Sequence, residues 1–454
     1  MRIAYFSPLS PIKSGVSHYS EELLPLLQEE FDIDLIIDDY QPTNKEITSR
    51  FETINYLRYD WLLKERGYDM NIYQLGNNPY HVYIYNTLKK YPGIVVLHEG
   101  MLHHMIRALT IPFFDEASYY RELKENHGEE GEKVAKLVLS GLGSNLLYFL
   151  YPCFRRAVEL SLGVIVHNRY LKDLVERECP DVPVSFVPMG IKPSEKRDGR
   201  KLKEALGLSD SYIISSFGLF SEMKGARTIL NIFAHFHSLY PNSYFFIVGE
   251  VSNELPLDSM LAERGISNKV RTTGFVEKET YEDIIAITDV ALNLRYPTGG
   301  ETSASLLRLM SAGKPVITSN LGQFRELPDD TVIKIDPGKY EEMELFYTLE
   351  LLYWRPDLRQ AYGERAREYI IKNHPLEKEV EGYISFIKEL KDKSKRELAK
   401  AQRRVARERA KFAKKLYHER LSQLADFKNI NHPYPEIIKR AISELGIGGR
   451  GKEE

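Results

Sequence analysis

The sequence predicts an α/β protein built from two doubly wound domains. At 454 residues, the chain exceeds the size at which a single hydrophobic core usually stops growing. Short apolar or β-branched runs alternate with helical periodicity over about residues 1 to 390, and this alternation is typical of parallel sheets covered by helices on both faces. A hydrophobic fraction of 43% and a charged fraction of 28% are those of an ordinary globular protein and exclude a disordered chain.

Ten strands are expected, in two sets of five. Each is a short run rich in β-branched or aromatic residues. The first set comprises residues 2–7, 31–38, 92–99, 162–168 and 184–188, and the second comprises residues 212–218, 243–250, 270–275, 290–295 and 314–319. Because ligands bind outside the carboxyl ends of the strands in open α/β sheets, a functional site is expected in the loops that follow these strands.

The two domains are expected to be joined within Pro188 to Arg200, where apolar periodicity lapses into proline, glycine and charged residues. An amphipathic helix is expected within residues 373–390, after the second sheet is complete. We therefore expect a first domain over residues 1–190, a second domain over 191–375, a further helix over 376–392 and a basic helical tail over 393–454.

The net charge of −3 conceals a basic segment near the carboxyl end. Between Lys391 and Arg420, thirteen Lys or Arg residues accompany four Asp or Glu residues, which leaves a net charge of −12 for the rest of the chain. Leu398, Val405 and Phe412 are spaced seven apart among these cations, as in a helix with a narrow apolar seam. The tail is expected to be a solvated helix or an oligomerisation arm, or to contact an anionic membrane surface; nucleic-acid binding is disfavoured.

Two observations favour a reducing, cytoplasmic location. Only two cysteines are present, and they lack metal-ligand spacing. The run MRIAYFSPLS has neither a basic leader nor a long apolar core, so no signal peptide is expected. Residues 137–154 are uncharged but contain glycine, asparagine and proline, and we interpret them as a buried or interfacial helix rather than a membrane-spanning one.

The stretch RYPTGGETSASLLRLMSAGKPVITSN, residues 295–320, is the strongest local indication of a site. A glycine-led loop follows an expected strand and enters a helix expected to begin at Glu301 or Thr302. Such a helix start offers unpaired amides that suit a phosphate, and Gly299 and Gly300 would let a ligand approach the backbone. Glu301 would accept hydrogen bonds from sugar hydroxyls beside that phosphate; alternatively, Glu301 or Thr302 only caps the helix.

The segment GGETSASLLRLMSAGKPVITSNLGQFRELP resembles the donor-site segment of GT-B glycosyltransferases of family four. Further similar segments are YFSPLSPIKSGVSHYSEELLP, YQLGNNPYHVYIYNTLKKYPGIVVLHEGMLHHM, IVHNRY, FVPMGI and GLFSEMKGARTIL, so the resemblance covers about residues 1–390. It implies two Rossmann-like domains facing a cleft, with the nucleotide mostly on the second domain and the acceptor on the first. It also implies that the helix over 376–392 crosses back to the first domain and that Glu301 has a ligand role.

The resemblance assigns roles to individual residues. Lys224 matches the lysine that neutralises the donor diphosphate, and Gly15 matches a first-domain glycine near the phosphate and the transferred sugar. His98 matches a histidine that faces the donor sugar from a strand end, and Glu99 follows it where relatives often carry Asp. Catalytic roles are thus expected for Lys224, Glu301 and His98, and donor contacts for Gly15, Gly299, Gly300, Thr302, Ser303 and Arg308.

The chain departs from the family pattern at three positions. The family has a glutamate at each end of a seven-residue gap in the donor loop, but Gly300 and Arg308 occupy the aligned positions and Glu301 is shifted by one. Arg308 cannot accept hydrogen bonds from ribose hydroxyls, so ribose recognition is expected to differ. Leu219 stands where an arginine commonly accompanies the diphosphate lysine. A subset of the family carries a loop of this GETS type.

The expected activity is retaining transfer of a sugar from a nucleotide diphosphate to a hydroxyl of a glycan, lipid-linked or small-molecule acceptor, in the cytoplasm or at the inner membrane face. No metal ion or other cofactor is expected, because Lys224 and the helix dipole would stabilise the leaving group. The sequence shows no pair of carboxylates flanking one site, as a glycosidase would require. The alternatives are a non-catalytic scaffold that binds nucleotide sugar without turnover, and an epimerase or phosphorylase.

Overall fold

The computed structural model describes residues 1–195 and 197–392, and the structural statements below concern these residues. By compactness the chain divides into two units, Met1–Asp392 and Lys393–Glu454. The predictions for the basic tail therefore lie outside the described residues.

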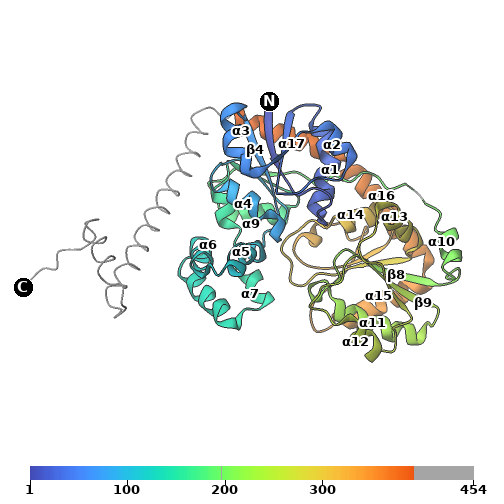
Figure 1. Ribbon diagram of the computed structural model, residues 1–454. Helices are drawn as coiled ribbons and strands as arrows, with labels where there is room; N and C mark the ends of the chain where they lie inside the picture. Colours follow the sequence, from blue (N-terminus) through green and yellow to red (C-terminus); the bar gives the residue numbers. More distant parts are fainter. Residues whose placement is uncertain (196, 393–454) are drawn as a thin grey trace, which may run out of the picture. The chain divides into compact units, whose positions relative to one another are not determined.

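The first domain is a seven-stranded parallel sheet in the order β3-β2-β1-β4-β5-β6-β7. Ile3 of β1 lies beside Ile33 of β2 on one side and beside Met70 of β4 on the other. Helices cover the sheet (Figure 1), and most strand side chains are buried. The strands are β1 Arg2–Phe6, β2 Asp32–Ile37, β3 Thr53–Asn55, β4 Met70–Leu75, β5 Ile94–Leu97, β6 Gly163–Val166 and β7 Val184–Phe186.

The helices of the first domain connect consecutive strands, except for a longer helical excursion between β5 and β6. This excursion contains four helices and a π-turn at residues 138–142. The helices are α1 Gly15–Leu27, α2 Lys45–Arg50, α3 Tyr59–Glu65, α4 Val82–Leu88, α5 His103–Thr110, α6 Glu116–Leu137, α7 Asn145–Leu150, α8 Arg155–Glu159 and α9 Arg169–Glu178.

The second domain is a six-stranded parallel sheet in the order β10-β9-β8-β11-β12-β13. Its strands are β8 Tyr212–Phe217, β9 Ser243–Val248, β10 Val270–Thr272, β11 Val290–Asn293, β12 Val316–Ser319 and β13 Ile333–Ile335. Its helices are α10 Arg200–Ala205, α11 Ala226–Leu239, α12 Leu257–Glu263, α13 Lys278–Ile287, α14 Ala304–Ser311, α15 Glu341–Trp354 and α16 Pro356–Asn373. Strand residues such as Ile214 and Ile317 form one core with Phe233 of α11 and with Leu345 and Leu349 of α15.

The prediction of two parallel α/β sheets is confirmed, and all ten expected strands are present. Three strands were missed: β3, β4 and β13. The central strand β4 contains Asn71 and Gln74, which weaken its apolar pattern, yet both side chains are buried and hydrogen-bonded. The strands β3 and β13 have only three residues each, which is too short for a pattern to stand out.

Between β7 and α10, residues 187–195 and 197–199 form neither helix nor strand. After the second sheet, α17 (Leu376–Asp392) packs on the first domain. A Cβ on Gly163 of β6 would lie 2.8 Å from Leu390 and 2.9 Å from Phe386, so the glycine allows α17 to approach the strand closely. Lys391 Nζ donates to Asp69 Oδ1 at 3.2 Å on the same domain.

Glu379 of α17 joins three parts of the fold through a fully buried carboxyl group. Its Oε1 accepts from the Tyr19 hydroxyl of α1 at 2.6 Å, and its Oε2 accepts from Gly190 N in the interdomain segment at 2.9 Å. Burial raises the pKa of Glu379 to about 8, against the lowering effect of these two hydrogen bonds. The carboxyl group is therefore largely protonated at neutral pH.

The segment 137–154 is not one continuous helix and is not buried throughout, so the expectation of a single buried helix was wrong, while the interfacial alternative stays a prediction. Gly141 has a φ of 80° and interrupts the helical path within the π-turn, and α7 begins only at Asn145. Leu142, Leu146 and Leu150 are exposed. Within the described residues, no helix has both the length and the apolar character needed to span a membrane.

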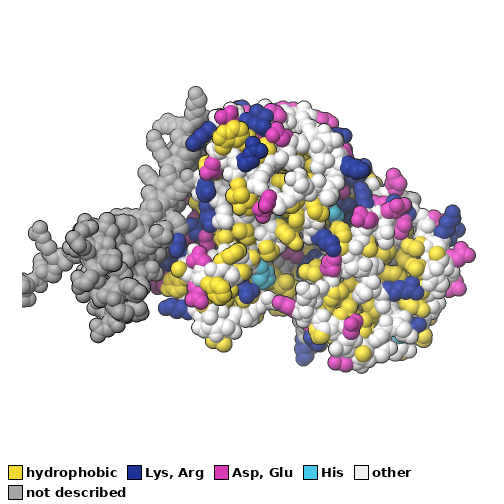
Figure 2. All heavy atoms as spheres, viewed as in Figure 1, with side chains coloured by type: hydrophobic (Ala, Val, Ile, Leu, Met, Phe, Trp, Pro, Cys, Tyr) yellow, Lys and Arg dark blue, Asp and Glu magenta, His cyan; other side chains and the backbone are white. Residues whose placement is uncertain are grey.

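The surface of the described residues mixes charges of both signs on the face that Figure 2 shows. Lys and Arg side chains lie among Asp and Glu side chains on both domains there. This face therefore has no continuous basic groove of the kind that follows a nucleic-acid backbone.

Glu379→Gln is expected to change how stability depends on pH. The folded chain raises the pKa of Glu379 from 4.5 to about 8, so its contribution to stability is full below pH 4.5 and is lost as the pH rises toward 8. Glutamine does not titrate, so the variant should gain stability relative to the wild type between those two pH values. Urea unfolding across this range measures the difference.

A second variant, Glu379→Ala, leaves Gly190 N–H without its acceptor, while the Tyr19 hydroxyl keeps the Tyr383 hydroxyl as a partner. It should cost about 1 to 3 kcal/mol. A stability difference between Glu379→Gln and the wild type that stays constant with pH would contradict a protonated Glu379.

Candidate functional site

Lys224 lies in a tight turn after β8, the central strand of the second sheet. Gly218 and Gly225 flank this turn with φ values of 90° and 70°, and residues 222–224 form a 3₁₀ turn between them. A Cβ on Gly218 would lie 3.0 Å from Lys224 Nζ. Glycine at position 218 therefore allows the ammonium group to fold back over the end of the strand.

The Lys224 ammonium group has no hydrogen-bond or ion-pair partner in the part of the chain that the structure describes. Burial, and then the charge of Arg295, lower the pKa of Lys224 well below its usual value, while Glu301 opposes this effect. A half-buried cation without a counter-ion favours binding of an anion, because the anion restores the charge balance.

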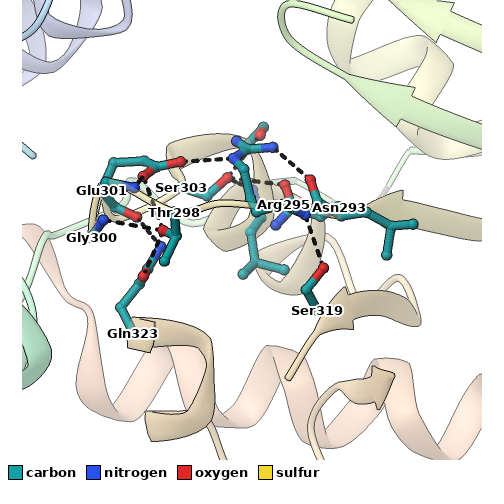
Figure 3. A network of polar contacts seen from close by, with 12 residues as sticks. Asn293, Arg295, Thr298, Gly300, Glu301, Ser303, Ser319 and Gln323 are labelled. Carbon is teal, nitrogen blue, oxygen red and sulfur yellow. Dashed lines mark hydrogen bonds and ion pairs between the residues drawn. The ribbon is translucent and has the colours of Figure 1, made fainter. Parts of the chain in front are cut away.

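Glu301 folds the loop between β11 and α14 back on itself, as Figure 3 shows. Its Oε1 accepts from Arg295 Nε at 2.8 Å. Its Oε2 accepts from Gly299 N at 3.1 Å and from Thr298 Oγ1 at 3.3 Å. Because Arg295 is only 7% exposed, this ion pair is shielded from solvent on one side and fixes both the loop and the guanidinium group.

The helix α14 begins at Ala304, not at Glu301 or Thr302 as expected. Ser303 is the N-cap: its Oγ accepts from Leu306 N at 3.4 Å and donates to Asn293 Oδ1 at 3.1 Å. The carboxylate of Glu301 is instead held by the loop. The capping interpretation of Glu301 was therefore wrong, and the predicted donor contact of Ser303 stays a prediction.

The loop glycines lie against the first domain. Gly299 O accepts from Gly100 N at 2.6 Å, and Gly300 O accepts from Asn168 Nδ2 at 2.7 Å. The same amide donates to Thr302 Oγ1 at 3.0 Å. Gly300 has a φ of 80°, which favours glycine. The two glycines thus allow the loops after β5 and β6 to approach the backbone closely. The predicted contacts of Gly299, Gly300 and Thr302 with a donor stay predictions.

His98 follows β5 and is 9% exposed. Its Nε2 lies 2.7 Å from Gln74 Oε1 and donates to it, since the Gln74 amide nitrogen donates to the Tyr5 hydroxyl. Burial, helped by His167 and His81, lowers the pKa of His98 well below its usual value, so the imidazole is neutral. Its Nδ1 has no partner among residues 1–195 and 197–392, so it is free to accept a hydrogen bond from a ligand.

Glu99 brings a second carboxyl group to the same loop. A Cβ on Gly299 would lie 3.4 Å from Glu99 Oε2 and 3.5 Å from Glu301 Oε2, so both groups face one point. Burial, and then Glu301, raise the pKa of Glu99 to about 8, which leaves Glu99 able to donate a hydrogen bond at neutral pH. The expectation that no two carboxyl groups flank the site was therefore wrong; the pair comes from two different domains.

Two further predicted residues lie at or against α1 of the first domain. Gly15 is the first residue of this helix, and no heavy atom lies within 4 Å of a Cβ built on it. Arg308 of α14 donates to Glu22 Oε1 of α1 at 2.9 Å. The guanidinium group of Arg308 thus forms an ion pair between the domains, and its predicted contact with the donor stays a prediction.

Sequence reasoning missed Arg295, the pairing of Glu99 with Glu301, and Asn168. A charged or amide residue just after a buried strand is the signal that all three share. Leu219, where an arginine was expected, is 48% exposed. Arg295 supplies a second cation near Lys224 from a different strand.

A cavity of about 400 Å³ lies beside the loop and is lined by both domains. Its lining includes His167, Asn168, Thr302, Ser303 and Lys378. A volume of this size accommodates a small ligand. Nowhere in the described ranges do three His, Cys, Asp or Glu side chains gather as metal ligands, and metal independence stays a prediction.

The chain matches the family described as glycosyl transferases group 1 over residues 198–369. The matched residues cover most of the second domain. Lys224, Arg295 and Glu301 all lie within the matched residues, whereas His98, Glu99 and Asn168 lie outside them.

Two curated relatives and one solved structure extend the comparison. An uncharacterized glycosyltransferase of Methanocaldococcus jannaschii is 23% identical over 278 residues, which are 60% of this chain and 69% of that protein. The alpha-monoglucosyldiacylglycerol synthase of Acholeplasma laidlawii is 25% identical over 224 residues, 48% of this chain and about half (54%) of the synthase. The crystal structure of Anabaena HepE in complex with UDP-glucose is 13% identical, with a TM-score of 0.63 over 86% of this chain and 100% of HepE. This likeness shows that the two sheets have the GT-B fold.

Ser303→Ala is expected to lower the free energy of unfolding by about 1 kcal/mol, because it removes the N-cap acceptor of α14 in the second domain. Urea unfolding measures the change. Ser305→Ala, two residues further along the chain, is the matched control and should have a smaller effect. Equal effects of the two variants would show that the cap of Ser303 contributes no stability.

Proposed function

We propose that this protein is a retaining glycosyltransferase that moves a sugar from a nucleotide diphosphate to a hydroxyl acceptor. The observation that carries the proposal is the half-buried amino group of Lys224 at the carboxyl end of β8, which has no counter-ion among residues 1–195 and 197–392. A diphosphate would supply the missing negative charge, and Arg295 would add a second positive charge nearby. The match of this domain to the glycosyl transferases group 1 family and the UDP-glucose bound to HepE support a nucleotide sugar as the donor.

The donor sugar would lie between the diphosphate and the first domain. There, the free Nδ1 of His98 accepts a hydrogen bond, the protonated Glu99 donates one and the ionised Glu301 accepts one. Glu99 and Glu301 face one point from two domains, and His98 directly precedes Glu99 in the loop after β5. Such a set can distinguish the positions of sugar hydroxyls, because a misplaced hydroxyl leaves a buried polar group unpaired.

In the proposed reaction the acceptor hydroxyl attacks the anomeric carbon from the face that the nucleotide leaves. The bond from the anomeric carbon to the phosphate oxygen breaks, the bond to the acceptor oxygen forms, and the acceptor proton passes to a phosphate oxygen. Lys224 stabilises the charge that develops on the diphosphate, so that neither a protein nucleophile nor a metal ion is required. The contacts of Gly100 and Asn168 with the loop would help to exclude water and limit hydrolysis of the donor.

A lipid-linked acceptor is supported by the helical excursion of the first domain. It exposes Phe113, Phe114, Leu142, Leu146 and Leu150, five large apolar side chains on the domain that is expected to bind the acceptor. One relative is a synthase of a glucosylated diacylglycerol, as its name states. With such an acceptor, the protein would work from the cytoplasm at the membrane face, through peripheral contact.

Lys224→Ala is expected to lower turnover by a factor equivalent to about 2 to 4 kcal/mol, since it removes a charge contact to the leaving group. Release of nucleoside diphosphate from UDP-glucose and related nucleotide sugars measures turnover. Lys201→Ala, at an exposed lysine of the same domain, is the control and should retain activity. Unchanged turnover of a folded Lys224→Ala variant would contradict the proposed role of Lys224 at the leaving diphosphate.

Glu301→Gln is expected to lower transfer while the affinity for the free nucleoside diphosphate changes little, because the carboxylate meets the sugar rather than the phosphates. A thermal-shift titration with UDP gives the affinity, and kcat/KM gives the transfer. A parallel loss of both would place Glu301 in phosphate binding instead. If the wild type binds nucleotide sugars but turns none over, the protein is a scaffold and the proposed activity is wrong.

A further inference from the structure

The helix α15 exposes an apolar stripe on the outer face of the second domain. Tyr340, the N-cap of α15, and four residues within the helix are each between 50% and 65% exposed. The five residues of this outer stripe are Tyr340, Met343, Tyr347, Leu351 and Trp354. Their spacing of three or four residues places them on one side of the helix over about four turns.

The opposite side of α15 packs against the core of the second domain. Leu345, Leu349 and Leu352 are buried in the core. The outer stripe therefore contributes little to this core, and a helix that is apolar on both sides normally has a partner on each. Isolated exposed apolar residues are common on protein surfaces, but five on one helix face form a continuous patch that marks an interaction site.

The spacing of the stripe is symmetric about Tyr347. Met343 and Leu351 lie four residues on either side, and Tyr340 and Trp354 lie seven residues on either side. A twofold interface must be self-complementary, since the same patch meets its own copy in the opposite direction. In an antiparallel pair of α15 helices, Tyr347 meets Tyr347, Met343 meets Leu351 and Tyr340 meets Trp354.

We propose that α15 is the interface of a homodimer, in which the outer stripes of two copies of this chain pack antiparallel across a twofold axis at Tyr347. The inference is independent of the proposed activity, because α15 lies outside the loops that carry the site. It assigns a partner, a second copy of the chain, to a surface that the reaction does not use.

The area of the stripe is sufficient for a modest interface. Five large side chains of about 200 Å² each, exposed to the extent given above, present roughly 550 Å² per copy. Pairing two stripes would bury roughly 1,100 Å² in total, just above the ~1,000 Å² expected of a specific interface. The dimer should therefore be specific and dependent on concentration.

The charges at the two ends of α15 also suit an antiparallel pair. The first turn contains Glu341, Glu342 and Glu344 without a cation, whereas Arg355 directly follows the last turn. Burial, and then Glu342 and Glu344, raise the pKa of Glu341, which indicates that negative charge is concentrated at this end. Because Arg355 is already paired with Asp357 at 2.7 Å, it does not neutralise the acidic end of a second copy. An antiparallel pair keeps the two acidic ends apart, whereas a parallel pair would bring them together.

Disulfide trapping in the full-length protein tests this geometry. Tyr347→Cys should form a disulfide-linked dimer on mild oxidation, because only a residue on the twofold axis meets its own copy. Met343→Cys and Leu351→Cys should each crosslink poorly alone but should crosslink with each other when the two proteins are mixed. The native cysteines are both buried, so the background should be low. Leu57→Cys, on the first domain and 71% exposed, is the matched control and should not crosslink.

Sedimentation equilibrium gives a second measurement. Tyr347→Arg places two guanidinium groups on the axis and should weaken dimerisation at least about tenfold, whereas Leu57→Arg should not. A monomeric wild type, or a dimer whose mass is unchanged in Tyr347→Arg, would overturn the proposal. Crosslinking of Tyr347→Cys no better than that of Leu57→Cys would do the same, and the stripe would then have a different partner.

Discussion

The ion pair between Arg295 and Glu301 is the interaction on which the rest of the site depends. It turns the loop after β11 back toward its own strand, so that the backbone of Gly299 and Gly300 faces the first domain. The same pair prevents Glu301 from neutralising Lys224 directly, since the carboxylate is already occupied. An unpaired ammonium group and an ordered loop are therefore two consequences of one interaction.

The electrostatics of the cleft follow from burial. His98 is neutral because an imidazolium would be desolvated beside two other histidines, and Glu99 is neutral because a carboxylate would be desolvated beside Glu301. Arg295 is paired with Glu301, whereas the amino group of Lys224 has no counter-ion among the described residues. This arrangement favours an anionic ligand that carries hydroxyl groups, since the neutral residues offer one donor and one acceptor beside the cationic end.

The two domains are tied together at positions that differ in chemical character. Near the loop between β11 and α14, the interdomain contacts include the hydrogen bonds donated by Gly100 and Asn168 and the ion pair of Arg308 with Glu22. At α17, the tie is the protonated carboxyl group of Glu379 between α1 and the interdomain segment. The polar ties near the loop can exchange partners with a ligand or with water, whereas the fully buried Glu379 cannot do so without unfolding its surroundings. Opening of the cleft should therefore begin at the loop and leave α17 in place.

The sequence by itself determined the two parallel sheets, because strands buried on both faces appear as short apolar runs; ten of the thirteen strands in the described residues could be predicted in this way. It also singled out Lys224, Glu301 and His98, each of which lies in or next to a loop after a strand, and their roles stay predictions. Tertiary structure alone decided that Ser303 caps α14, that Arg295 holds Glu301, and that Glu99 and Asn168 of the first domain reach the loop of the second. It also left one side of α15 uncovered. The physical reason is that local pattern reports which side chains must be buried, whereas hydrogen bonds and ion pairs between residues far apart in the chain depend on where the folded backbone places them.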